Sequence, residues 1–105
     1  MFIAMNRFKI AIGSESRFEE IWRRRDSRLK ENLGFVEFHL LRGATNAESG
    51  YTQFVSHSVW QSEADFIAWT KSENFRAAHR NAGDNREIYL GPPVFEGYCA
   101  VEGIN

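Results

Sequence analysis

The chain has 105 residues, a formal net charge of −1 and 26% charged residues. A charge this close to neutral argues against nucleic acid as the main partner, because phosphate binding requires an excess of clustered Lys and Arg. The length predicts one domain over residues 1–105. Nine Phe and three Trp can line an apolar pocket as well as fill a core.

The N-terminal residues 1–6 contain no basic stretch and no long apolar run, so they predict a strand and not an export signal. No segment approaches the roughly 20 apolar residues of a membrane span. The only cysteine, Cys99, excludes an intrachain disulfide and is expected to be a buried thiol in a strand. We therefore expect a cytoplasmic protein with no membrane partner.

Hydrophobic patterning predicts the element order β-α-β-β-α-β. The predicted strands are 2–10, 35–42, 51–60 and 94–101, with polar loops at 43–50 and 81–93. The first helix opens at Gly13-Ser14 and ends near Asn32, and its stripe combines Phe18, Ile21, Trp22, Arg25 and Leu29. This order is the α+β, ferredoxin-like arrangement, an antiparallel sheet with two helices on one face.

The second helical region is expected to contain a break. Ser62 with Asp65 forms a capping box, which starts a first helix near Glu63. Ser72 is a second candidate cap, and Glu73 follows it in what would be a first turn. The sequence thus predicts two short helices that meet near Ser72.

The break determines where four rings point. Phe66 and Trp69 are three residues apart, and Phe75 and His79 are four apart, so each pair shares a face of its own helix. A straight helix would place Trp69 and His79 about 80° apart around the axis. A break at Ser72 can turn both into one cavity.

Both faces of the second strand carry apolar groups. Alternation places Val36, Phe38 and Leu40 on one face and Phe35, His39 and Leu41 on the other. Two helices can cover only one face, and a large exposed apolar patch usually marks an interface. We expect a homodimer whose two sheets face each other.

Three polar residues, Asn6, Arg25 and His79, each have a structural interpretation and a ligand-binding one. Asn6 shares a strand face with apolar groups, either as a satisfied amide near a sheet edge or as a donor to a ligand. Arg25 lies on the apolar helix stripe, where it either extends to solvent, pairs with a Glu, or binds a ligand carboxylate. His79 is either a packed or capping residue or a metal ligand.

The sequence contains no zinc motif, phosphate-binding glycine loop or nucleophile elbow. His39 and His57 have no metal-ligand spacing and are interpreted as structural. Composition and spacing therefore predict a ligand-binding α+β dimer and go no further.

Three motifs carry a family resemblance: N-R-F in the first strand, S-V-W-x-S-x-x-x-F before the second helical region, and W-x-K-S-x-x-F-R-A-A-H-R within it. With the strand G-F-V-E-F-H-L-L-R, the chain resembles the IsdG-type heme-degrading monooxygenases of the antibiotic-biosynthesis-monooxygenase superfamily. The likeness covers nearly the whole chain and is nearest to the bacterial heme-utilisation branch.

The resemblance implies a role for each candidate residue. His79 corresponds to the axial ligand of the heme iron, Asn6 to the distal polar group and Trp69 to the ring that crowds the porphyrin. Arg25 matches a basic position near the propionates, and Phe66 and Phe75 would help to hold heme. Heme would be both substrate and cofactor, with O₂ as co-substrate, a bilin-type product and iron release.

Electrons would come from outside, from a reductase or a small-molecule reductant, because the sequence has no flavin or nicotinamide fingerprint. Two alternatives stay open. One is a cofactor-free oxygenase of the same superfamily that acts on a quinol or polyketide. The other is a non-catalytic heme-binding dimer.

Overall fold

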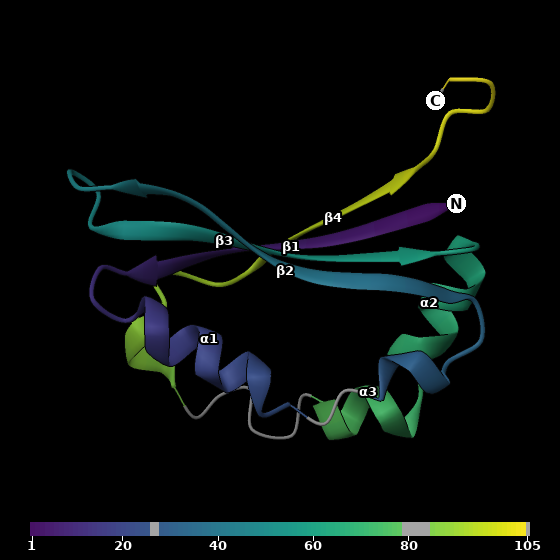
Figure 1. Cartoon of the computed structure of the whole chain (residues 1–105), viewed down its shortest axis with the longest axis horizontal. Coiled ribbons are helices and arrows are strands. Elements are labelled where there is room, and N and C mark those ends of the chain that lie inside the picture. Colours follow the sequence, from purple (N-terminus) through teal and green to yellow (C-terminus); the bar gives the residue numbers. More distant parts are fainter. Residues whose placement is uncertain (26–27, 79–84, 105) are drawn as a thin grey trace.

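A computed structural model describes residues 1–25, 28–78 and 85–104. Its four strands form one antiparallel sheet in the order β2-β3-β1-β4, and α1, α2 and α3 lie on the same face of it (Figure 1). The α+β, ferredoxin-like fold is therefore confirmed. The elements are β1 (Phe2–Ala11), α1 (Glu15–Arg23), η1 (Leu29–Glu31), β2 (Phe35–Asn46), β3 (Tyr51–Trp60), α2 (Glu63–Thr70), α3 (Glu73–Ala78), η2 (Arg86–Ile88) and β4 (Val94–Cys99).

No helix in the described ranges has the length and hydrophobicity needed to cross a bilayer. Cys99, expected to be buried, is exposed. It is the last residue of β4, and β4 is an edge strand, so less protein surrounds the thiol than an interior strand would provide.

Strand β1 organises the core. It pairs with β3 along its whole length, from Phe2 opposite Trp60 to Ala11 opposite Tyr51. Its alternate side chains face the helices and contribute to two separate clusters of buried residues. One contains Phe8, Ile10, Phe18, Phe54 and Ile88, and the other contains Phe2, Ala4, Leu29 and Trp60. Asn6 lies on β1 between these clusters.

Helix α1 is shorter than expected, because it ends at Arg23 and not near Asn32. Its last turn tightens, with the Arg25 N–H bonded to the Trp22 carbonyl at 3.3 Å. Arg28 then adopts a left-handed backbone conformation, φ 48°, before a single 3₁₀ turn at η1. The chain changes direction here because Phe18 belongs to one core cluster and Leu29 to the other.

Strand β2 departs from the expected alternation. A register shift between Phe35 and Glu37 lets both Phe35 and Phe38 pack against the second cluster, while Val36 is 52% exposed. Strict alternation was therefore the wrong assumption at this bulge. The strand also continues to Asn46, four residues beyond its predicted end, because Thr45 pairs with Thr52 and their hydroxyls lie 2.8 Å apart.

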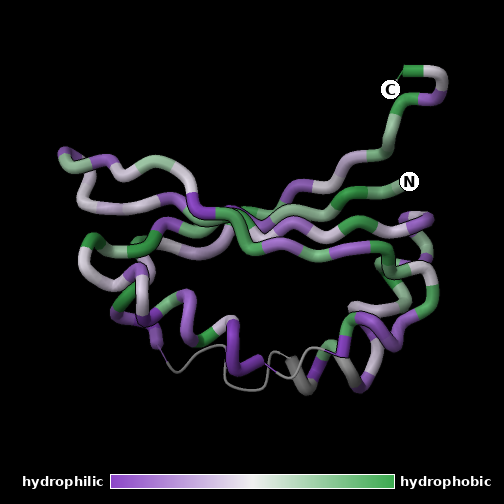
Figure 2. The backbone as a smooth tube through the Cα atoms, viewed as in Figure 1, coloured by the Kyte–Doolittle hydropathy of each residue, from purple (hydrophilic) through white to green (hydrophobic). Residues whose placement is uncertain are grey.

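The sheet face opposite the helices is not covered by any described element of this chain (Figure 1). Hydrophobic stretches run along the strands, while α1 is mainly hydrophilic on its outer side (Figure 2). Val94, Tyr98 and Leu41 on this face are 56%, 49% and 45% exposed.

A partly buried hydrogen-bond network holds the start of α1 against β3. Thr52, which is fully buried, donates to Glu15 Oε2 at 2.7 Å, and the Gly13 N–H donates to Glu15 Oε1 at 2.8 Å. The hydrogen bond from Thr52, followed by backbone donors, lowers the pKa of Glu15 below its usual 4.5. An ionised carboxylate near the N-terminus of α1 also suits the helix dipole.

We predict that Glu15→Gln lowers the urea midpoint at pH 7 and that the difference from wild type shrinks below pH 4.5. The pKa of Glu15 is lower folded than unfolded, so its charge stabilises the fold above the unfolded value. This stabilisation is lost as pH falls through the folded-state pKa. Urea titrations at pH 7 and pH 3 measure it, with Glu48→Gln on the exposed β2–β3 turn as control. An equal difference at both pH values would contradict the prediction.

Candidate ligand-binding cavity

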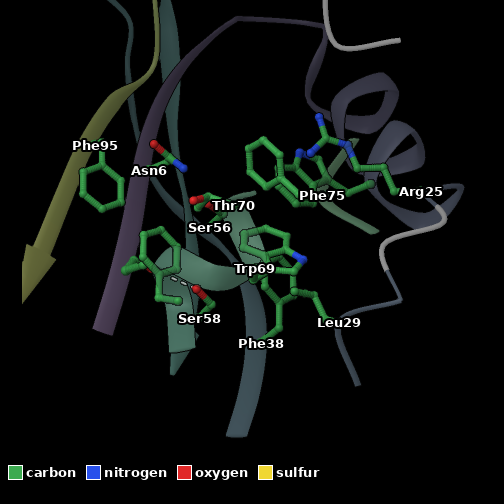
Figure 3. Close-up of a pocket in the computed structure, with 13 residues that line it drawn as sticks. Asn6, Arg25, Leu29, Phe38, Ser56, Ser58, Trp69, Thr70, Phe75 and Phe95 are labelled. Carbon is green, nitrogen blue, oxygen red and sulfur yellow. Dashed lines mark hydrogen bonds between the residues drawn. The ribbon is translucent and has the colours of Figure 1, made fainter. Parts of the chain in front are cut away.

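A cavity of about 340 Å³ lies between the helices and the sheet, in the interval between the two core clusters. Its volume is within the range of about 300–1,000 Å³ typical of small-molecule sites. Most of its lining is apolar. The lining residues are Ala4, Asn6, Trp22, Arg25, Leu29, Phe38, Ser56, Ser58, Phe66, Trp69, Thr70, Phe75 and Phe95 (Figure 3).

Asn6 and Ser56 form a polar spot on the sheet side of this cavity. They are directly opposite each other in the β1–β3 register, so their side chains leave the sheet on the same face. Neither side chain makes a hydrogen bond within the described part of the chain. Of the two interpretations of Asn6, the structure places it in the cavity on an inner strand, and not at a sheet edge.

The break at Ser72 is confirmed, and Ser72 caps the second helix. Its Oγ accepts a hydrogen bond from the Phe75 N–H at 3.1 Å and donates to the Trp69 carbonyl at 2.6 Å. Ser62 caps α2 in the same way, by accepting from the Asp65 N–H at 3.2 Å. Because one hydroxyl joins the end of α2 to the start of α3, it fixes the direction of both helices.

This break brings the rings of α2 and α3 together, as predicted for Phe66, Trp69 and Phe75. The centroids of Trp69 and Phe75 lie 4.8 Å apart, with their planes at 82°. Phe66 stacks on Phe95 of β4 at 5.7 Å and 11°. Trp69 also packs against the buried Trp60 at 5.5 Å. The aromatic wall of the cavity is thus anchored in the core.

Arg25 lies on the opposite side of the cavity from Asn6, with Phe75 and Trp69 between them (Figure 3). Its guanidinium lies 4.0 Å from the centroid of Trp22, and Trp22 stacks on Phe38 at 5.5 Å. Burial lowers the pKa of Arg25, with the Tyr89 phenol acting in the opposite direction. Within the described ranges Arg25 forms no salt bridge, so a half-buried cation faces the cavity without a carboxylate.

The structure therefore brings together five of the six predicted site residues: Asn6, Arg25, Phe66, Trp69 and Phe75. The sixth, His79, lies outside the described residues. Sequence reasoning did not place Trp22, Phe38, Ser56 or Phe95 in the site. The helix stripe that contains Trp22 could have identified this residue. Phe38, Ser56 and Phe95 line the cavity because of the strand register and the bulge in β2, which the sequence does not show.

The model of the antibiotic biosynthesis monooxygenase family matches residues 1–81, and the chain belongs to this family. Among proteins of known sequence, a heme-degrading monooxygenase of Shouchella clausii (strain KSM-K16) is 32% identical over 78 residues. That match covers 74% of this chain and 66% of the relative, so it spans just under two thirds of that protein.

Solved structures share the fold. The heme-degrader MhuD of Mycobacterium tuberculosis, with two hemes bound in its active site, superimposes with a TM-score of 0.71 at 21% identity and covers 100% of both chains. SnoaB of Streptomyces nogalater, a cofactor-independent oxygenase, gives 0.69 at 21% identity over 96% of this chain and 93% of its own. The fold thus occurs both with heme and without a cofactor.

The cap at Ser72 yields a prediction about stability. Ser72→Ala removes the acceptor for the Phe75 N–H and should lower the free energy of unfolding by about 1 kcal/mol, the usual effect of losing an N-cap. Ser72→Asp keeps an acceptor and should recover most of the loss. Urea unfolding measures the stability, and near-UV circular dichroism reports the Trp69–Phe75 contact. Equal stability of Ser72→Ala and wild type would show that the cap does not hold α3.

Proposed function

We propose that this family member is a heme-degrading monooxygenase, which uses O₂ and external electrons to open the porphyrin to a bilin-type product and release iron. One observation carries the proposal: an apolar cavity has on one side a polar spot, Asn6 and Ser56, for which the described residues supply no hydrogen bond, and on the other side a half-buried cation, Arg25. Heme has a matching polarity, an apolar macrocycle with a metal at its centre and carboxylates at one edge. The similarity to the Shouchella clausii enzyme supports the same substrate.

The residues of the cavity fit such a ligand. Arg25, held against Trp22, would bind a propionate carboxylate, which favours the charged guanidinium that burial disfavours. Phe66, Trp69 and Phe75 would pack on the macrocycle and exclude water. Trp69 would crowd the macrocycle, and its contacts with Trp60 and Phe75 support this proposal because they hold the ring from other sides.

Heme when bound would supply the redox chemistry, and the chain would supply position, shape and hydrogen bonds. Asn6 would present its amide to the ligand from the sheet side. His79, which follows α3 in the sequence, is proposed to hold the iron of bound heme, and a neutral imidazole suits that role. The electron donor is proposed to be a separate reductase or a small-molecule reductant.

We also propose that residues 1–105 form one domain and that two copies associate through their uncovered sheet faces. Val94, Tyr98 and Leu41 on this face give it the exposed apolar surface that an interface would cover. Sedimentation velocity should give twice the mass of the chain, and a Leu41→Glu variant should shift the distribution toward the monomer. A monomer at micromolar concentration would contradict this assembly.

A cofactor-free oxygenase acting on a quinol or polyketide is the second candidate, supported by the shared fold with SnoaB. A hemin titration separates the two. Heme degradation predicts a shifted Soret band for wild type and a different or absent shift for His79→Ala. No Soret shift with wild type would favour the cofactor-free reaction.

The direct test is turnover. Wild-type protein with hemin, O₂, catalase and a reductant should lose the Soret band, gain bilin absorbance and release iron that a ferrous chelator detects. Asn6→Ala should slow Soret loss by about 10²-fold, the cost of removing one donor from a reacting centre. A Soret band that persists with abundant reductant would instead indicate a non-catalytic heme-binding protein.

Arg25 gives a binding prediction with a matched control. Arg25→Ala should weaken hemin binding by about tenfold, consistent with the loss of one charge-assisted hydrogen bond. Arg24→Ala changes the neighbouring arginine, whose side chain is 81% exposed and paired with Glu20 at 3.0 Å, and should bind hemin as wild type does. Equal weakening in both variants would point to general charge and not to the cavity.

A further inference from the structure

Ser56 is a buried polar residue that the family resemblance does not assign. It is 7% exposed, lies on the inner strand β3 and lines the cavity directly opposite Asn6. Within the described ranges its hydroxyl makes no hydrogen bond. A hydroxyl in a mostly buried residue normally has a partner, and because the described chain supplies none, a molecule in the cavity can supply it.

Ser58 shows what a structural serine looks like in the same strand. It points to the same face two residues further along and is equally buried, at 8% exposure. Its hydroxyl accepts a hydrogen bond from the Trp60 Nε1–H at 3.0 Å and donates to the Ala4 carbonyl at 3.5 Å. Thr70, the third hydroxyl of the cavity, donates to the Ile67 carbonyl at 2.6 Å. Ser58 and Thr70 are thus occupied by the protein, and Ser56 is available to a ligand.

The surroundings of Ser56 restrict what that ligand can be. Ala4 and Phe8 flank Asn6 along β1, and most of the other residues that line the cavity are apolar, among them Phe66, Trp69 and Phe75. The Asn6–Ser56 spot is therefore a small polar area in a largely apolar lining. It suits one or two polar atoms, such as a water molecule or a diatomic ligand, and not an extended polar group.

We propose that Ser56 and Asn6 together form a two-point hydrogen-bonding site for a small oxygen-containing ligand on the sheet side of the cavity. Asn6 supplies an amide and Ser56 a hydroxyl, which can donate while it also accepts. Two donors from neighbouring strands fix the direction of a ligand more closely than one. The inference rests on the proposed heme-binding function and adds Ser56 as a ligand-contacting residue.

Carbon monoxide bound to the reduced hemin complex of the full chain is a suitable probe, because a nearby hydrogen-bond donor lowers the C–O stretching frequency. We expect Asn6→Ala and Ser56→Ala each to raise this frequency, and the double variant to raise it further. Ser56→Thr keeps the hydroxyl and should stay near the wild-type frequency. Ser16→Ala, at an exposed serine of α1 that does not line the cavity, is the control, and its frequency should equal that of wild type.

A second measurement follows Soret loss under turnover. Ser56→Ala should slow it by about two- to tenfold, the effect of one neutral hydrogen bond, with hemin affinity unchanged. Urea midpoints of Ser56→Ala and of the control Ser16→Ala verify that both variants remain folded.

The outcomes separate this inference from the function on which it rests. Hemin binding and turnover by wild type with the same C–O frequency in Ser56→Ala would overturn the two-point site and leave the proposed function intact. Ser56→Thr provides the test if Ser56→Ala does not fold. A C–O frequency of Ser56→Thr that equals the frequency of Asn6→Ala would then overturn the two-point site. Failure of wild type to bind hemin would overturn both.

Discussion

The antiparallel register of β1 and β3 is the constraint on which the site depends. It places Asn6 opposite Ser56, and it places apolar side chains on both sides of that pair along the same sheet face. The apolar side chains at each end of β1 belong to a separate core cluster. Asn6 and Ser56 lie between the two clusters, and the cavity that they line lies at the same position.

The second requirement is a helix break. If α2 and α3 were one straight helix, the rings at its two ends would point in different directions around the axis. Ser72 prevents this by bonding to the last turn of α2 and to the first turn of α3. Trp69 and Phe75 then meet edge to face in the lining of the cavity, to which the sheet and the helices both contribute.

Charge completes the arrangement. Arg25 lies on the cavity side of the segment that follows α1, where Trp22 and Phe38 form a stack beneath it. Its neighbours Arg23 and Arg24 instead pair with Glu19 and Glu20 on the exposed surface. Three successive arginines therefore have different environments, and only Arg25 faces the apolar volume. A ligand that carries a carboxylate would give the Arg25 guanidinium an anionic partner.

Much of this was accessible from the sequence. Hydrophobic periodicity gave the order and type of the elements, capping serines gave the break at Ser72, and polar residues at apolar positions identified Asn6 and Arg25. These signals are local, since each depends on residues within a few positions of one another. The role of His79 stays a prediction that rests on the family resemblance, because this residue lies outside the described ranges.

Only the tertiary structure decided which strands pair, in which register and with which bulge. These choices put Ser56 beside Asn6, brought Phe95 of β4 against Phe66 and turned Phe38 toward Trp22. Each joins residues distant in the chain, and a shift of one residue would have sent the side chains to the opposite face. Local patterns thus determine the elements and the candidate polar groups, while long-range pairing determines the cavity that they share.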